Sequence, residues 1–154
     1  MNEGNEAMAE DEAAEPPSAD PFHRVGPATG DQLAPIRRAL ADWARAIGAA
    51  EDLIEEIVLA TDEAMSNVIS HAYPDRPGEF ELRAESRPES GRIEITLRDQ
   101  GRWQPPAQPD IRHGRGLPLI RALAEQASIE PSSVGTTVRM SWPLVSVTDR
   151  GAEV

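Results

Sequence analysis

Two segments in the first half of the chain carry apolar residues at the spacing of an amphipathic helix. Between residues 31 and 47 the apolar side chains recur every three or four positions, which places them on one helical face, and Gly48 follows. The same pattern covers residues 51–73 and stops at Pro74, because the residue before a proline disfavours helical geometry. We therefore expect two helices over these ranges.

In the middle of the chain the period changes to two, as in a strand with one buried and one solvated face. Apolar residues alternate with charged or polar ones over 79–85 and 93–98, and a turn at 88–91 joins the two runs into a hairpin. Further elements expected are a strand at 22–25, a helix at 117–126, and strands at 127–130 and 136–144, the last with Val138, Met140 and Trp142 facing inward.

This order of elements predicts an α+β fold, a two-layer α/β sandwich whose mainly antiparallel sheet carries helices on one face. The domain should cover residues 21–144. Residues 1–20 contain seven acidic residues, no basic ones and few large apolar ones, so we expect a disordered acidic tail. Residues 145–154 should form a frayed tail, and the proline-rich stretch 100–115 a long loop of the functional or mobile kind.

Composition narrows the range of functions. Acidic residues outnumber basic ones 27 to 15 in this chain of 154 residues, and the formal net charge of −12 disfavours binding to nucleic acid or to anionic membranes. The lack of cysteine excludes disulfides, thiol nucleophiles and cysteine metal sites. No apolar run has the length of a membrane span and no signal-peptide pattern opens the chain, so we expect a cytoplasmic protein.

Glu63 and Asn67 are the first candidates for chemistry. They lie four residues apart on the second predicted helix, so they project from the same side, and His71 continues the line. The carboxylate could accept a proton, and the amide oxygen could bind a hard cation such as Mg²⁺. Taken alone, such a pair is more often an ordinary polar flank of a helix.

A second candidate stands at the end of a predicted strand. Asp99 continues the inward phase of that strand, and Gly101 follows two residues later. A carboxylate directed into the core needs partners, and glycine permits an unusual backbone angle or the close approach of a ligand. Together they suit the edge of a planar heterocycle, with Asp99 accepting a hydrogen bond from an exocyclic amine. An isolated Asp-x-Gly is more often a turn.

Two glycine motifs complete the set. The run GRGL at 114–117 stands at the entry of a predicted helix, where backbone amides and the helix dipole favour an anion such as phosphate. Gly135 and Thr136 open the last strand. The glycine allows another group to approach the main chain closely, and the threonine hydroxyl can form hydrogen bonds to a base and to a carboxylate. Each of these signals is weak by itself.

In order and spacing, the motifs resemble those of a known superfamily. The series consists of Glu-Ala-x-x-Asn on a helix ending in His-Ala-Tyr, then Asp-x-Gly, Gly-Arg-Gly-Leu and Gly-Thr-Thr-Val. It is similar to the series in the ATP-binding superfamily that gyrase B, heat-shock chaperones of the ninety-kilodalton class and histidine kinases share. The stretches LAPIRRALADWARAIG, DQGRW and GRGLPLIRALAEQ resemble, more narrowly, the stand-alone anti-sigma-factor serine kinases, over about residues 22–143.

The resemblance implies a Bergerat-type ATP-binding fold and a role for each motif. Glu63 would be the general base that activates the attacking hydroxyl, and Asn67 would bind the magnesium ion that bridges the phosphates. Asp99 would read the adenine amine, with Gly101 beneath the base. The other implied nucleotide-binding residues are the phosphate-side lid with its helix start, and the opening of the last strand: Gly114, Arg115, Gly116, Leu117, Gly135 and Thr136.

Arg115 is also a candidate catalytic residue. The chain contains no lysine, so cationic help at the phosphates can come only from the metal, from His113, or from arginines such as Arg112 and Arg115. Because Arg115 stands between two glycines, we expect it to approach the terminal phosphate.

The resemblance further implies ATP and Mg²⁺, a serine acceptor on an anti-anti-sigma protein, a sigma factor held inactive, and a possible homodimer. The alternative is a regulatory module that binds ATP or ADP and switches its partners without phosphoryl transfer. A histidine-kinase fragment is disfavoured because His23 precedes a single short helix, and a metal hydrolase because the three histidines are scattered. Arg37 and Arg38, off the apolar stripe of the first helix, could form a docking patch or an ordinary solvated face.

Overall fold

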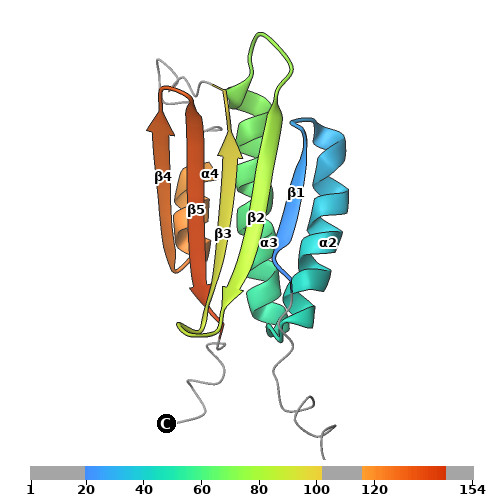
Figure 1. Cartoon of the computed structure of the whole chain (residues 1–154), viewed down its shortest axis with the longest axis vertical. Coiled ribbons are helices and arrows are strands. Elements are labelled where there is room, and N and C mark those ends of the chain that lie inside the picture. The colour runs from blue at the N-terminus through green and yellow to red at the C-terminus, as the bar shows by residue number, and fades with distance from the viewer. Residues whose placement is uncertain (1–19, 102–115, 145–154) are drawn as a thin grey trace, which may run out of the picture.

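The computed structural model describes residues 20–101 and 116–144, which form a two-layer α+β sandwich (Figure 1). One layer is a sheet in which every neighbouring pair of strands is antiparallel. Its five strands, in spatial order, are β1 (Phe22–Pro27), β2 (Glu79–Arg87), β3 (Arg92–Asp99), β5 (Gly135–Pro143) and β4 (Gln126–Ser132). The predicted fold class is therefore confirmed.

The second layer consists of helices that all lie on one face of the sheet (Figure 1). They are the short 3₁₀ turn η2 (Gly30–Gln32), α2 (Leu33–Ala46), α3 (Glu51–Asn67), the π-helical segment η3 (Val68–Ala72) and α4 (Gly116–Leu123). Helix α3 lies between α2 and α4 and packs against both. It is thus the central element of the helical layer.

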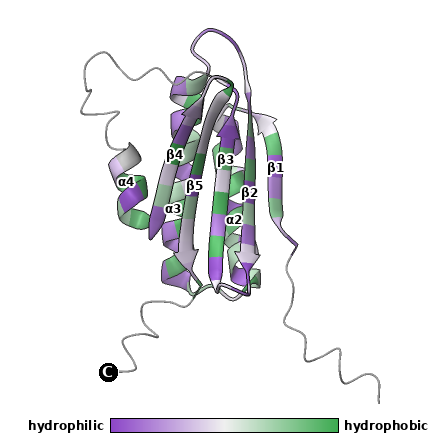
Figure 2. Cartoon of the chain, turned by 60° about the vertical axis from the view of Figure 1, so that its left-hand side comes forward, coloured by the Kyte–Doolittle hydropathy of each residue, from purple (hydrophilic) through white to green (hydrophobic). Residues whose placement is uncertain are grey.

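The core lies between the two layers and draws on both. Along the strands hydrophobic residues alternate with hydrophilic ones (Figure 2), and the hydrophobic set faces the helices. Val138, Met140 and Trp142 of β5 are buried, as the alternation predicts, and Leu40 and Ile57 meet the sheet from α2 and α3. Each such large side chain contributes about 1.5–3 kcal/mol when it is removed from water.

The long helix predicted over 51–73 is confirmed, with one refinement. Helix α3 continues without a break into η3, whose five residues have the wider π-helical hydrogen-bonding pattern. Such segments are rare and occur frequently at functional sites. The helix predicted over 31–47 is present as η2 followed by α2.

The prediction for the last helix was wrong at its end. Helix α4 ends at Leu123, whereas the sequence prediction placed its end at residue 126. The N–H of Glu125 donates to the carbonyl of Ser141 at 3.1 Å, and Gln126 already pairs with Ser141 in the β4–β5 ladder. The helix therefore ends where the chain begins to pair with β5.

Three predicted features lie outside the described residues: the acidic tail up to residue 19, the loop over 102–115, and the tail from residue 145. Among the helices that the structure does describe, none is long and apolar enough to span a membrane.

Candidate active site

Helix α3 carries the predicted acid–amide pair along the border of its buried face. Ala60 and Ala64 are fully buried, while Glu63 and Asn67 are each half-buried. Asn67 is the last residue of α3, and the π-helical segment begins directly after it. The sequence prediction that these two residues share a side at the edge of the core is therefore confirmed.

Arg37, which the sequence suggested as part of a docking patch, forms an ion pair with a residue next to the acid–amide pair. Its Nε lies 2.9 Å from Oδ1 of Asp62, the neighbour of Glu63, so the contact joins α2 to α3. Arg38 is exposed. The ion pair gives Arg37 a role within the helical layer, whatever it does for a partner protein.

Asp99 ends β3 and is buried, with 5% of its surface exposed. Its Oδ1 accepts a hydrogen bond from the N–H of Gly101 at 2.9 Å, so the carboxylate closes a tight turn over its own chain. In the β3–β5 ladder Asp99 stands opposite Thr136, which is also buried. The inward direction predicted for Asp99 is confirmed, and strand pairing brings Thr136 beside it.

Gly101 is required because its backbone lies against the end of the central helix. A Cβ added at this position would lie 2.0 Å from the carbonyl oxygen of Ala72, the last residue of η3. The φ of Gly101 is outside the left-handed region, so of the two alternatives that the sequence left open, the unusual backbone angle is excluded. The close approach that the structure shows is to the helix end.

Gly135 has a second requirement of the same kind. A Cβ there would lie 1.9 Å from the carbonyl oxygen of Asp99, and its φ of +148° disfavours any other residue. The group that approaches this glycine closely is thus the main chain of Asp99. We call the place where Ala72, Asp99, Gly101, Gly135 and Thr136 meet the site corner.

Sequence reasoning missed Tyr73 as a participant in this corner. Its hydroxyl accepts a hydrogen bond from the N–H of Gln100 at 2.8 Å and donates one to the carbonyl of Glu79 at 2.6 Å. Gln100 is the residue between Asp99 and Gly101. The available signal was the tyrosine that ends the His-Ala-Tyr motif, but no pattern in the sequence identifies its partners, which lie 6 and 27 residues away.

The phosphate-side candidates are described only in part. Gly114 and Arg115 lie outside the described residues, as do Arg112 and His113. Gly116 and Leu117 open α4 as predicted, and α4 packs against α3, the helix of Glu63 and Asn67. The entry of α4 and the acid–amide pair thus belong to neighbouring helices.

Within the described residues, no cluster of three or more acidic or histidine side chains could hold a metal ion. The donor at hand is the amide oxygen of Asn67. Mg²⁺ commonly keeps most of its waters and takes one or two protein oxygens together with substrate phosphates. A single amide donor at the border of the core fits that mode of binding.

Comparison with known proteins confirms the resemblance over most of the chain. Residues 26–142 match the model of the histidine kinase-like ATPase domain family. The serine-protein kinase RsbW of Bacillus licheniformis is 29% identical over 140 residues, which are 80% of this chain and 86% of that protein. The serine-protein kinase RsbW of Bacillus velezensis is 30% identical over 138 residues, with the same two coverages.

Solved structures share the fold. The structure of the RsbU and RsbW domains of Rv1364c from Mycobacterium tuberculosis superposes with a TM-score of 0.67 at 27% identity, over 81% of this chain and 32% of that one. The blue-light activated histidine kinase of Erythrobacter litoralis EL346 gives 0.58 at 22% identity, over 78% of this chain and 43% of that one.

Proposed function

This chain belongs to the histidine kinase-like ATPase family and, within it, to the anti-sigma serine-protein kinases, and we propose that it transfers a phosphoryl group from Mg-ATP to a serine. By resemblance, the acceptor is an anti-anti-sigma protein, and the second partner is a sigma factor that the chain otherwise holds inactive. The observation that carries the proposal is the family match across 26–142, which spans both the acid–amide pair and the site corner.

At the adenine end of the proposed site, Asp99 accepts a hydrogen bond from the exocyclic amine of the base. Its Oδ1 accepts a hydrogen bond from the N–H of Gly101, and this bond helps to fix the direction of the carboxylate. Thr136, opposite Asp99 in the ladder, assists through its hydroxyl. Gly101 and Gly135 allow the main chain to close around this acid.

At the phosphate end, Glu63 takes the proton from the acceptor serine while the serine oxygen bonds to the γ-phosphorus. The bond from that phosphorus to the β,γ-bridging oxygen breaks, and ADP leaves. Asn67 would bind Mg²⁺ through its amide oxygen, and this ion neutralises charge on the phosphates when bound. Positioning and charge neutralisation account for most of the rate in such reactions.

Arg115 is proposed to approach the terminal phosphate. Because the chain lacks lysine, an arginine is the natural fixed cation for that position. In the Arg115→Ala variant, transfer should slow more than ADP binding weakens, since the γ-phosphoryl group is absent from ADP. Equal losses in both measurements would contradict this role.

We further propose that the chain is a cytoplasmic homodimer. A kinase that holds a sigma factor must share the compartment of that factor, so the cytoplasm is the location that we propose. The resemblance supports a homodimer, and light scattering during gel filtration distinguishes the mass of one chain from that of two. Neither nucleic acid nor a membrane is proposed as a partner, in line with the net charge of −12.

The decisive experiment combines Mg-ATP with candidate acceptor proteins from the same genome and measures intact masses. The wild-type chain should add one phosphoryl group to its acceptor. Glu63→Gln should bind ADP as the wild type does and transfer almost nothing, because the proton acceptor is lost. Glu55→Gln is the matched control, since Glu55 is exposed on the same helix outside the acid–amide pair.

Two results would overturn the proposal in different ways. If calorimetry finds no binding of ATP or ADP, the nucleotide site itself is refuted. If wild type and Glu63→Gln bind nucleotide alike and neither modifies any acceptor, the chain is a regulatory module that binds nucleotide without transferring phosphate.

A further inference from the structure

One phenol joins three separate elements at the site corner. Tyr73 follows η3, the end of the central helix. Its hydroxyl donates to the carbonyl of Glu79 at the start of β2, at 2.6 Å, and accepts from the N–H of Gln100 just after β3, at 2.8 Å. Both hydrogen-bonding directions of the hydroxyl are therefore used on main-chain groups.

The ring of Tyr73 has little freedom to move. A Cβ added at Gly78 would lie 2.1 Å from an atom of the ring, so the main chain of Gly78 lies directly against it. The carbonyl of the preceding residue, Ala72, is in equally close contact with Gly101. Two glycines thus fit the helix end and the aromatic ring against neighbouring main chain, and the hydroxyl is held in place.

The hydroxyl is linked to the Asp99 carboxylate through a short stretch of main chain. Tyr73 holds the N–H of Gln100, the next N–H belongs to Gly101, and that group donates to Oδ1 of Asp99 at 2.9 Å. A shift of the peptide unit that carries the Gln100 N–H would also displace the Gly101 donor, because the two planar peptide units share the Cα atom of Gln100. The direction of the carboxylate then depends on Tyr73.

We propose that Tyr73 is a positioning residue that orients the Asp99 carboxylate through the Gln100–Gly101 main chain and thereby sets the selectivity for adenine nucleotides. This inference rests on the proposed function, since it assumes that Asp99 reads the exocyclic amine of the base. It adds a specificity determinant that makes no contact with the nucleotide itself.

The test compares ADP with inosine diphosphate, which carries an oxygen where adenine has its amine. The wild-type chain should prefer ADP. In Tyr73→Phe the ring remains and the hydroxyl is lost, so the ratio of the two affinities should fall about 3- to 10-fold, the range expected for one hydrogen bond. Affinity for inosine diphosphate should change less than about twofold, because that base offers Asp99 no amine.

Two further variants separate positioning from general destabilisation. Trp142→Phe removes another hydrogen bond to a main-chain carbonyl, from Nε1 to Leu123 at 2.9 Å, away from the site corner. It should lower the midpoint of thermal unfolding and leave the nucleotide ratio unchanged. In Asp99→Asn, which lowers the ratio directly, the addition of Tyr73→Phe should cause no further loss.

A measurement without a mutation is also available, because Tyr73 is the only tyrosine in the chain. Growth on 3-fluorotyrosine labels this one site, so it also serves if Tyr73→Phe does not fold. The fluorine resonance should shift on saturation with ADP and shift less with inosine diphosphate.

The possible outcomes distinguish a failure of the proposed function from a failure of the positioning role of Tyr73. If the wild type binds neither nucleotide, the proposed function fails and takes this inference with it. If the wild type prefers ADP but Tyr73→Phe keeps the same ratio, or loses both affinities equally, the positioning role is refuted while the proposed function stands. A fluorine resonance that is unmoved by ADP would refute the inference in the same way.

Discussion

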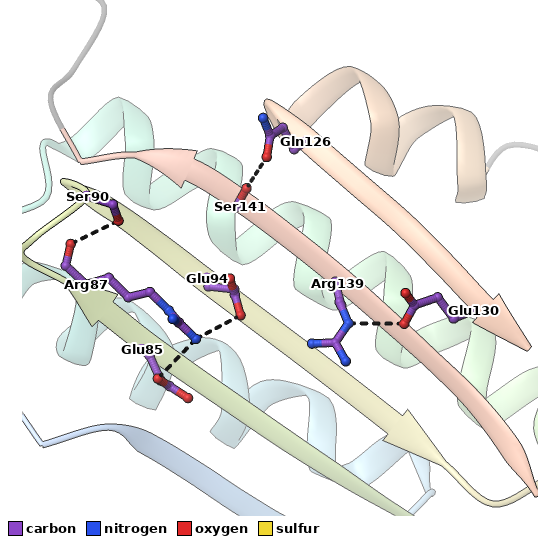
Figure 3. A network of polar contacts seen from close by, with 8 residues as sticks. All are labelled: Glu85, Arg87, Ser90, Glu94, Gln126, Glu130, Arg139 and Ser141. Atoms are coloured by element: carbon purple, nitrogen blue, oxygen red, sulfur yellow. Dashed lines mark hydrogen bonds and ion pairs between the residues drawn. The ribbon is translucent and has the colours of Figure 1, made fainter.

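The site corner and the opposite side of the sheet are held by different kinds of contact. At the site corner the main chains approach so closely that a methyl group at Gly101 or Gly135 would lie about 2 Å from a carbonyl oxygen. The side of the sheet without helices, which we call the outer face, carries charged pairs instead (Figure 3). Its contacts include Arg87–Glu94 at 3.4 Å, Arg87–Glu85 at 3.8 Å and Arg139–Glu130 at 3.1 Å.

The two regions should differ in how they respond to substitution. On the outer face both partners of each pair reach water, which screens their attraction, and such pairs contribute about 0–1 kcal/mol. At the site corner the neighbouring atom is a carbonyl oxygen of the main chain, which cannot rotate away as a side chain can. The geometry of the candidate site therefore depends on a few glycines, whereas the outer face tolerates exchange.

The largest effect is expected at Gly135. Alanine there would combine an unfavourable φ of +148° with a collision against the Asp99 carbonyl, so Gly135→Ala should lower the free energy of unfolding by about 3 kcal/mol or more. Gly48→Ala is the matched control, because Gly48 also has a positive φ but has open space around it. Denaturant unfolding should give it a cost of only about 1–2 kcal/mol. Equal costs would show that the collision is relieved.

Gly101 should follow, with a smaller effect on stability and a clear one on binding. Gly101→Ala would push the helix end and the Asp99 turn apart, at a cost of about 1–3 kcal/mol, and calorimetry should find at least about tenfold weaker ADP binding. Gly30→Ala, at a glycine with open space around it, should leave both quantities within about 0.5 kcal/mol of wild type. Unaltered ADP binding in Gly101→Ala would contradict the placement of the site here.

On the outer face the expected effects are small. Arg139→Gln should lower the free energy of unfolding by less than about 0.5 kcal/mol and leave nucleotide binding unchanged, because the Arg139–Glu130 pair is exposed. A double-mutant cycle with Glu130→Gln measures the coupling in the pair. A coupling well above 1 kcal/mol would erase the contrast between the two regions.

The smallest effect is a pH dependence at Glu81. The hydrogen bond from His23 lowers the pKa of the Glu81 carboxyl below its ordinary value, with help from Arg83. Because the folded-state pKa is lowered, the stabilisation is present above the ordinary pKa and is lost as the pH falls through the lowered one. In His23→Gln, NMR titration should find a higher pKa for Glu81, and its deficit in stability should fade at acidic pH. A pKa that is unaltered in this variant would refute the assignment.

Local pattern was sufficient for most of the elements. The alternation over 93–98 predicted both β3 and the inward direction of Asp99, and the spacing over 51–73 predicted the central helix with Glu63 and Asn67 at the border of its buried face. These predictions hold because buried positions recur with the period of the helix or strand, so the pattern of apolar residues in the sequence reveals them. The roles of Glu63, Asn67 and Arg115 remain predictions.

What the sequence alone determined is therefore the class of fold, the order of its elements, the phase of each buried face and the family to which the motifs belong. The tertiary structure explains why Gly101 and Gly135 are glycines and why α4 ends early. It also determines that the Tyr73 hydroxyl bonds to the main chain of Glu79 and Gln100. All of these depend on contacts between segments that are distant in the chain or belong to different elements. Such contacts leave no periodic signal, because they arise only when the helical layer and the sheet pack together.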